Sequence, residues 1–172
     1  AEFSIGSGSK VYDLAKQPLL LMLLARFDAN GNALRQHKDL TRAQLYNSLI
    51  RDFIRREQEK DPQFRRKAPK EQQAILDQVF SRFGIVAMGM YNRSTTSINS
   101  TQLSRDLSYF TGEERTEQDG DMLFGSFFFI HTPKAKDQQK NLYAYEFLHN
   151  TFGEFLAADY MARQLFRDEK CP

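Results

Sequence analysis

The chain has 172 residues, enough for one domain and somewhat more. Its residues are 41% apolar and 27% charged, a composition that can bury a core and argues against intrinsic disorder. A single cysteine, Cys171, excludes a disulfide framework. The longest apolar run, from Leu19 to Ala25, is far shorter than the ~20 residues that span a bilayer, so we expect a cytoplasmic protein without a membrane segment.

The net charge of +2 is unevenly distributed along the chain. Residues 1–90 carry 15 Lys and Arg against 10 Asp and Glu, whereas residues 91–172 carry 9 against 12. The basic excess is concentrated between Arg51 and Lys70. Such a stretch fits either a solvated, salt-bridged helix face or a binding patch for nucleic acid or another domain, and its interspersed acids favour the first.

The first half of the chain predicts helices. Residues 1–10 contain Gly-Ser-Gly-Ser, which is typical of a flexible linker or of a remnant of an expression vector. A helix is expected from Pro18 to about Phe27, and it should be buried because it is apolar nearly all round. The clearest helix runs from Thr41 to Lys60, where Thr41 and Gln44 have the spacing of a capping box.

A second long helix is expected to start at Pro69, with an apolar stripe at helical spacing. After it, Ile98 favours a short strand, Ser100 is expected to cap a further helix, and residues 111–121 form a charged loop. The stripe consists of Ile75, Leu76, Val79, Phe80, Phe83 and Val86.

Two aromatic-rich runs follow, Phe124–Thr132 and Asn141–Leu148, and they predict the strands of a β-hairpin. Thr151 and Glu154 have capping-box spacing and should start the last helix. The order helix, short strand, helix, hairpin is a winged-helix layout. We therefore expect a mainly α protein, with a small helical domain at residues 11–65 and a winged-helix domain with one β-hairpin at residues 66–172.

None of the three histidines lies in a metal or nucleophile motif. His37 and His131 are expected to be structural. His149 stands where a strand stops and a helix begins, and helix N-termini attract anions, so its imidazole N–H could reach a phosphate oxygen. From the residues alone, a histidine bonded to the local backbone is the favoured reading.

No catalytic carboxylate pair and no metal site is predicted, because the acids between Glu113 and Asp121 lack the spacing of a calcium loop. The same acids weaken a winged-helix DNA-binding hypothesis, since they would face the groove and be repelled by phosphates. The hairpin turn contains three lysines that favour DNA binding, Lys134, Lys136 and Lys140. They carry less weight than the acids, because the acids would face the groove.

Three stretches together, residues 15–25, 43–57 and 145–158, resemble the C-terminal part of the NACHT module of signal-transduction NTPases, the class of NOD-like receptors and bacterial STAND proteins. The third stretch, Tyr-Glu-Phe-Leu-His-Asn-Thr-Phe-Gly-Glu-Phe-Leu-Ala-Ala, is the most specific. The resemblance covers about residues 11–166. It implies a helical domain and a winged helix that pack behind a nucleotide-binding core.

The resemblance assigns two nucleotide contacts. Pro18 matches the proline that packs beside the adenine, and His149 matches the histidine that contacts the β-phosphate of ADP. It also implies a switch that is off when ADP is bound. When ATP is bound, the switch is on and the protein oligomerises with itself. The resemblance further implies a link to bacterial defence. The partner would be the N-terminal NTPase core of the same chain.

The phosphate loop and the magnesium-binding strand of that core are absent from these residues. The sequence is therefore expected to be a regulatory fragment that does not hydrolyse ATP by itself and holds no nucleotide tightly. Two alternatives stay open: a winged-helix DNA-binding module that uses residues 51–70 and the hairpin lysines, and a protein-interaction scaffold.

Overall fold

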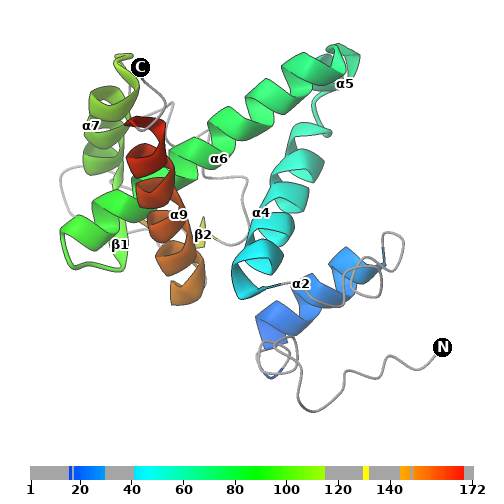
Figure 1. Ribbon diagram of the computed structural model, residues 1–172, viewed down its shortest axis with the longest axis horizontal. Helices are drawn as coiled ribbons and strands as arrows, with labels where there is room; N and C mark the ends of the chain where they lie inside the picture. The colour runs from blue at the N-terminus through cyan, green and yellow to red at the C-terminus, as the bar shows by residue number, and fades with distance from the viewer. Residues whose placement is uncertain are drawn as a thin grey trace, which may run out of the picture. The chain divides into compact units, whose positions relative to one another are not determined.

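The computed structural model describes residues 16, 18–29, 41–114, 130–131, 144–147 and 149–168 (Figure 1). They form a mainly helical structure with a small antiparallel sheet, in agreement with the predicted class. The elements are α2 (Pro18–Asp28), α4 (Arg42–Gln58), α5 (Pro62–Arg66), α6 (Pro69–Asn92), β1 (Ser97–Asn99), α7 (Ser100–Thr111), β2 (Ile130–His131), β3 (Ala144–Phe147) and α9 (Asn150–Asp168).

The chain divides into two units, residues 1–56 and residues 57–172. In the first unit, α2 begins at Pro18 as expected. The helix is not buried all round, however, because Leu21 and Met22 are 42% and 49% exposed. Among the side chains of α2 that the structure describes, those at i, i+3 and i+4 are buried, which is the stripe that a surface helix buries. These are Leu20, Leu23 and Leu24.

Helix α4 starts with the predicted capping box. The backbone N–H of Gln44 donates to Thr41 Oγ1 over 3.2 Å, and the N–H of Thr41 donates to Gln44 Oε1 over 2.8 Å. Two backbone donors at the helix start are satisfied in this way. The apolar stripe of α4 is buried, as the spacing predicts, and consists of Leu45, Tyr46, Leu49, Ile50, Phe53 and Ile54.

A short helix, α5, stands where the sequence predicted only the end of the preceding helix. The Asp61 carboxylate accepts the N–H of Gln63 over 2.8 Å, and Pro62 occupies the first helical position. An Asp-Pro pair is a helix-start signal as well as a helix breaker, so this element could have been predicted.

Helix α6 is the element against which the second unit packs. It begins at Pro69, as predicted, and contacts α7, α9 and β1 (Figure 1). Its first half buries one stripe, from Leu76 to Phe80, whereas between residues 83 and 90 only Met88 is not fully buried. The second half therefore forms the centre of the core.

Two glycines let neighbouring helices approach α6 closely. A Cβ atom at Gly84 would lie 2.9 Å from the Cβ atom of Tyr160 in α9. A Cβ atom at Gly89 would overlap the carboxylate of Asp106 in α7. The two glycines are five residues apart in the helix, which places them about 140° apart around its axis. They therefore lie on different faces of α6.

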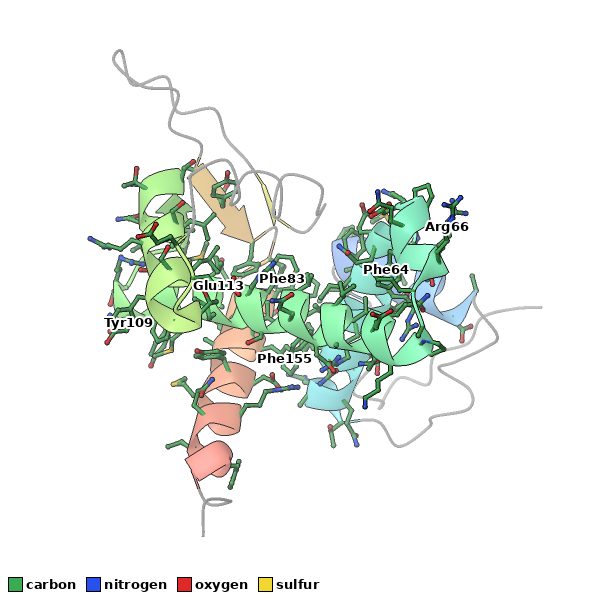
Figure 2. All side chains as sticks on the ribbon, turned by 90° about the horizontal axis from the view of Figure 1, so that it is seen from above. Phe64, Arg66, Phe83, Tyr109, Glu113 and Phe155 are labelled. Atoms are coloured by element: carbon green, nitrogen blue, oxygen red, sulfur yellow. The ribbon has the colours of Figure 1, made fainter. Side chains whose placement is uncertain are left out.

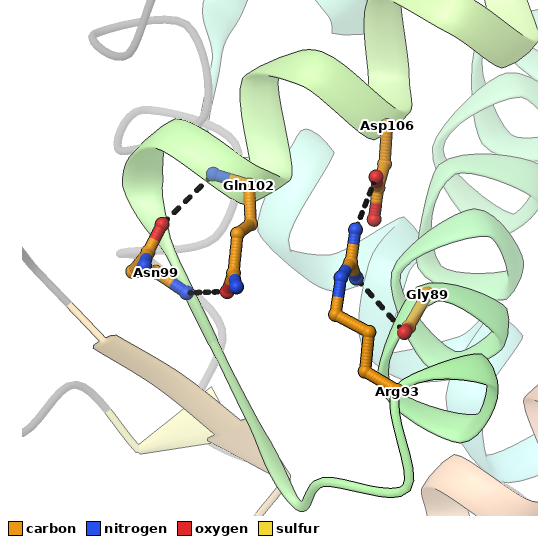
Figure 3. Close-up of polar contacts among 5 residues, drawn as sticks. All are labelled: Gly89, Arg93, Asn99, Gln102 and Asp106. Carbon is orange, nitrogen blue, oxygen red and sulfur yellow. Dashed lines mark hydrogen bonds and ion pairs between the residues drawn. The ribbon is translucent and has the colours of Figure 1, made fainter.

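Polar contacts fix α7 against the end of α6 (Figure 3). The Arg93 guanidinium donates to the Asp106 carboxylate and, over 2.8 Å, to the carbonyl of Gly89. Asp106 is 8% exposed, so Arg93 supplies the charge that this buried carboxylate requires.

The cap of α7 differs from the prediction. Asn99, and not Ser100, is the capping residue: its side chain accepts the N–H of Gln102 over 2.8 Å, and Gln102 Oε1 accepts the N–H of Asn99 over 3.1 Å (Figure 3). The helix starts one residue earlier because Asn99 and Gln102 form a complete capping box.

The sheet has the strand order β1-β3-β2, and both pairings are antiparallel. The strand predicted at Ile98 pairs with β3, where Ile98 lies opposite Tyr145. The described parts of the two runs predicted as hairpin strands also pair, with Ile130 opposite Phe147. The segment that connects them, and the acidic segment after Glu114, lie outside the described residues.

The close contact at Gly84 yields a stability prediction. Gly84→Val should lower the free energy of unfolding by about 1–3 kcal/mol, because the new side chain meets Tyr160 at its rigid Cβ end. Gln78→Val, at an exposed position of the same helix, should change it by about 0.5 kcal/mol or less. Chemical denaturation followed by circular dichroism measures both, and equal losses would contradict the packing account.

Candidate functional site

The two residues predicted to contact nucleotide lie in different units. Pro18 is the first residue of α2 in the first unit, and its side chain is exposed. His149 is half-buried and immediately precedes α9 in the second unit. Each is therefore placed at a helix start within its own unit, as the sequence predicted for both.

His149 occupies the N-cap position of α9. The backbone N–H of Thr151 donates to His149 Nδ1 over 3.3 Å, and Thr151 Oγ1 lies 2.8 Å from the same nitrogen. The N–H of Phe152 donates to the carbonyl oxygen of His149 over 3.1 Å. The imidazole thus satisfies a donor of the first helical turn, a role that Ser, Asp or Asn usually performs.

The contacts of Nδ1 bear on which ring nitrogen carries the proton. A neutral imidazole has one N–H donor and one acceptor nitrogen. When Nδ1 accepts the Thr151 N–H, the proton of a neutral ring is on Nε2, and the 2.8 Å contact with Thr151 Oγ1 is compatible with either tautomer. In that tautomer His149 has a donor at Nε2 that the cap does not use, and an anion near the start of α9 could accept from it.

The capping box predicted at Thr151 and Glu154 is wrong in its position. Helix α9 begins at Asn150, so Thr151 is already the second helical residue and cannot be the cap. The histidine takes the cap position because its Nδ1 is within reach of the Thr151 N–H. Histidine is uncommon among N-cap residues, which is why the sequence pattern favoured threonine.

The electrostatics of this helix start suit an anion. The first turn of α9 contains no acidic residue, so the partial positive charge of the helix N-terminus is not neutralised there. Gly153 lies against Phe147, and a Cβ atom at Gly153 would be 3.0 Å from Cδ2 of that ring. This contact holds the end of β3 beside the first turn of α9 and so positions His149.

The structure also shows two hollows that sequence reasoning missed. A groove of about 550 Å³ lies between α6 and α9, and Arg163 covers the Phe80 ring there at 5.2 Å from its centroid. A smaller hollow of about 170 Å³ adjoins the start of α9. The smaller hollow is lined by Glu154 and not by His149. Because a carboxylate repels negative charge, this hollow is poorly suited to an anion. The two hollows arise from the packing of elements that are distant in the sequence, so local sequence patterns could not predict them.

Within the described ranges, no group of three or more His, Cys, Asp or Glu side chains could hold a metal ion. Among the helices that the structure describes, none combines the length and apolar character needed to cross a bilayer. His131 lies in β2 opposite Glu146. The predictions for His37 and the hairpin lysines concern residues outside the described ranges.

Comparisons with models of protein families, with curated proteins and with solved structures gave no match for this chain.

The cap role of His149 can be separated from any ligand role by substitution. His149→Ala should lower the free energy of unfolding by about 1 kcal/mol, because the N–H of Thr151 loses its acceptor. His149→Asn should retain most of the stability, since asparagine is among the best N-cap residues. Thermal unfolding of the two variants and the parent measures the difference; equal stability of all three would show that His149 does not cap α9.

Proposed function

We propose that this chain is a regulatory part of a NACHT/STAND-type signal-transduction NTPase and senses the nucleotide state of the neighbouring core. In this proposal ADP holds the switch off, and ATP releases it and permits self-oligomerisation. The chain itself catalyses no reaction. The nucleotide is bound in the full-length protein, in contact with the N-terminal NTPase core.

The observation that carries the proposal is the geometry at His149. Its Nδ1 is engaged by the start of α9, and in the tautomer in which Nδ1 accepts the Thr151 N–H, the Nε2–H is left to donate. A helix start without acids and with one fixed imidazole donor can bind a terminal phosphate, because both attract negative charge. ADP has such a phosphate, and the resemblance of residues 145–158 assigns His149 to it.

The arrangement of the second unit supports the finer fold assignment, a winged-helix domain. The order α6, β1, α7, β2, β3 places a strand between two helices and follows it with a two-stranded wing. Strand β1 joins the wing by pairing with β3. In the first unit, Pro18 supports the assignment of a helical domain, since its exposed ring at the start of α2 could pack beside a base.

The test uses the full-length parent protein loaded with a fluorescent ADP analogue. His149→Asn keeps an acceptor for the Thr151 N–H but removes the Nε2–H donor. The variant should release ADP about 10- to 100-fold faster than the parent, since a hydrogen bond to a charged group contributes about 1.5–3 kcal/mol. His149→Ala should release it equally fast or faster.

A matched control is Asn150→Ala, which alters an exposed residue of the same helix start and leaves the imidazole in place. It should leave the release rate within about twofold of the parent. An unchanged release rate for His149→Asn, with stability also unchanged, would contradict the proposal and leave His149 only its structural role.

A further inference from the structure

Four basic side chains gather where α5 meets α6, and we call this set the basic corner: Arg65, Arg66, Lys67 and Lys70. All four are exposed. Within the part of the chain that the structure describes, none of them forms an ion pair. In Figure 2, Arg66 projects away from α5. Phe64, in the same helix, is buried, with an exposed fraction of 2%.

Three of the four carboxylates between positions 57 and 71 are engaged with other groups, and the fourth, Glu59, is exposed and forms no ion pair with the basic corner in the described part of the chain. Asp61 accepts the N–H of Gln63 at the start of α5, and Glu71 accepts the N–H of Ala68 over 3.2 Å. Glu57 pairs with Lys60 at 2.7 Å. The cations of the basic corner are therefore left to solvent, in contrast to the salt-bridged helix face that the sequence favoured for this stretch.

The backbone of the corner is held rigidly. The Gln72 side-chain amide donates to the carbonyls of Phe64 and Lys67, over 3.1 Å each. The N–H of Lys67 also donates to the carbonyl of Phe64 over 3.1 Å. Because the Cα positions are fixed before binding, only side-chain freedom is lost when the four cations meet an anion.

Glu113, one of the acids that argued against nucleic acid binding, lies far from this corner. Helix α6 has 24 residues and is therefore about 36 Å long. Glu113 follows α7, which packs at the end of α6 opposite to the basic corner, as Figure 2 shows for Glu113 and Arg66. Charges at that separation are screened, since the Debye length is about 8 Å at physiological salt.

The side chains of the basic corner fit some kinds of polyanion better than others. Arginine binds phosphate through two parallel N–H donors. Phe64 is the only aromatic residue between positions 57 and 72, and because it is buried the corner offers no surface for base stacking. The same stretch exposes no large apolar side chain that could insert into a membrane.

We propose that the basic corner binds the phosphate backbone of double-stranded nucleic acid without reading its sequence. This activity is independent of the nucleotide switch, because none of its residues is near the start of α9 in sequence or shares its contacts. Four phosphate contacts predict a slope of about −3.6 for the logarithm of the association constant against the logarithm of salt concentration.

The test is a fluorescence-anisotropy titration of the chain with two labelled DNA duplexes of unrelated sequence, at several salt concentrations. Both duplexes should bind alike, with dissociation constants of about 10⁻⁶–10⁻⁴ M at physiological salt. Arg65→Glu combined with Arg66→Glu should weaken binding at least tenfold at low salt and make the slope shallower by about 2.

The control is Arg42→Glu combined with Arg105→Glu, which changes the net charge equally at exposed positions outside the corner. It should weaken binding less than threefold, and circular dichroism should show both variants folded. Equal weakening by the two pairs would overturn the proposal, since overall charge would then be responsible. Absence of duplex binding together with binding to anionic phosphatidylserine vesicles would also overturn it.

Discussion

The second unit depends on the close approach of two helices to α6. Gly84 and Gly89 have no side chains, so Tyr160 of α9 and Asp106 of α7 pack directly against the α6 backbone. Asp106 is buried at this contact, and Arg93 supplies the compensating charge. A bulkier residue at either glycine would separate α6 from one of its neighbours, because well-packed cores adapt poorly to added volume.

This packing determines what each end of α6 can do. At one end, α9 and the sheet are held together, and Phe147 lies against Gly153, which places His149 at the start of α9. At the other end, α5 is attached through Gln72 and presents the basic corner. The proposed phosphate contact of the switch and the proposed nucleic acid contact thus belong to separate surfaces of the same unit.

Local patterns predicted much of this fold. The capping box at Thr41, the start of α6 at Pro69 and the pairing of the aromatic-rich strands all depend on neighbouring residues or on alternation, and they are confirmed. The caps of α7 and α9 were misplaced by one or two residues. In both cases the sequence offered a serine or threonine just after the residue that actually caps.

The remaining features required tertiary information. The exposure of Leu21 and Met22 in α2 could not be predicted, because both side chains are compatible with burial. The sequence identified His149 as lying at a helix start, but which ring nitrogen the helix would use depends on a contact of 3.3 Å that no pattern specifies. Likewise, the sequence could not show which cations between Arg51 and Lys70 are paired and which face solvent. That distinction depends on the contacts of the acids in the same stretch.

The central claim for function is that the His149 ring carries its proton on Nε2 and so can donate to a phosphate. Long-range ¹H–¹⁵N correlation spectroscopy of the imidazole tests it directly, because protonated and unprotonated ring nitrogens resonate at distinct ¹⁵N shifts. The account predicts an unprotonated Nδ1, which accepts the N–H of Thr151, and a protonated Nε2. A proton on Nδ1, donated to Thr151 Oγ1, would leave Nε2 without a donor and contradict the account.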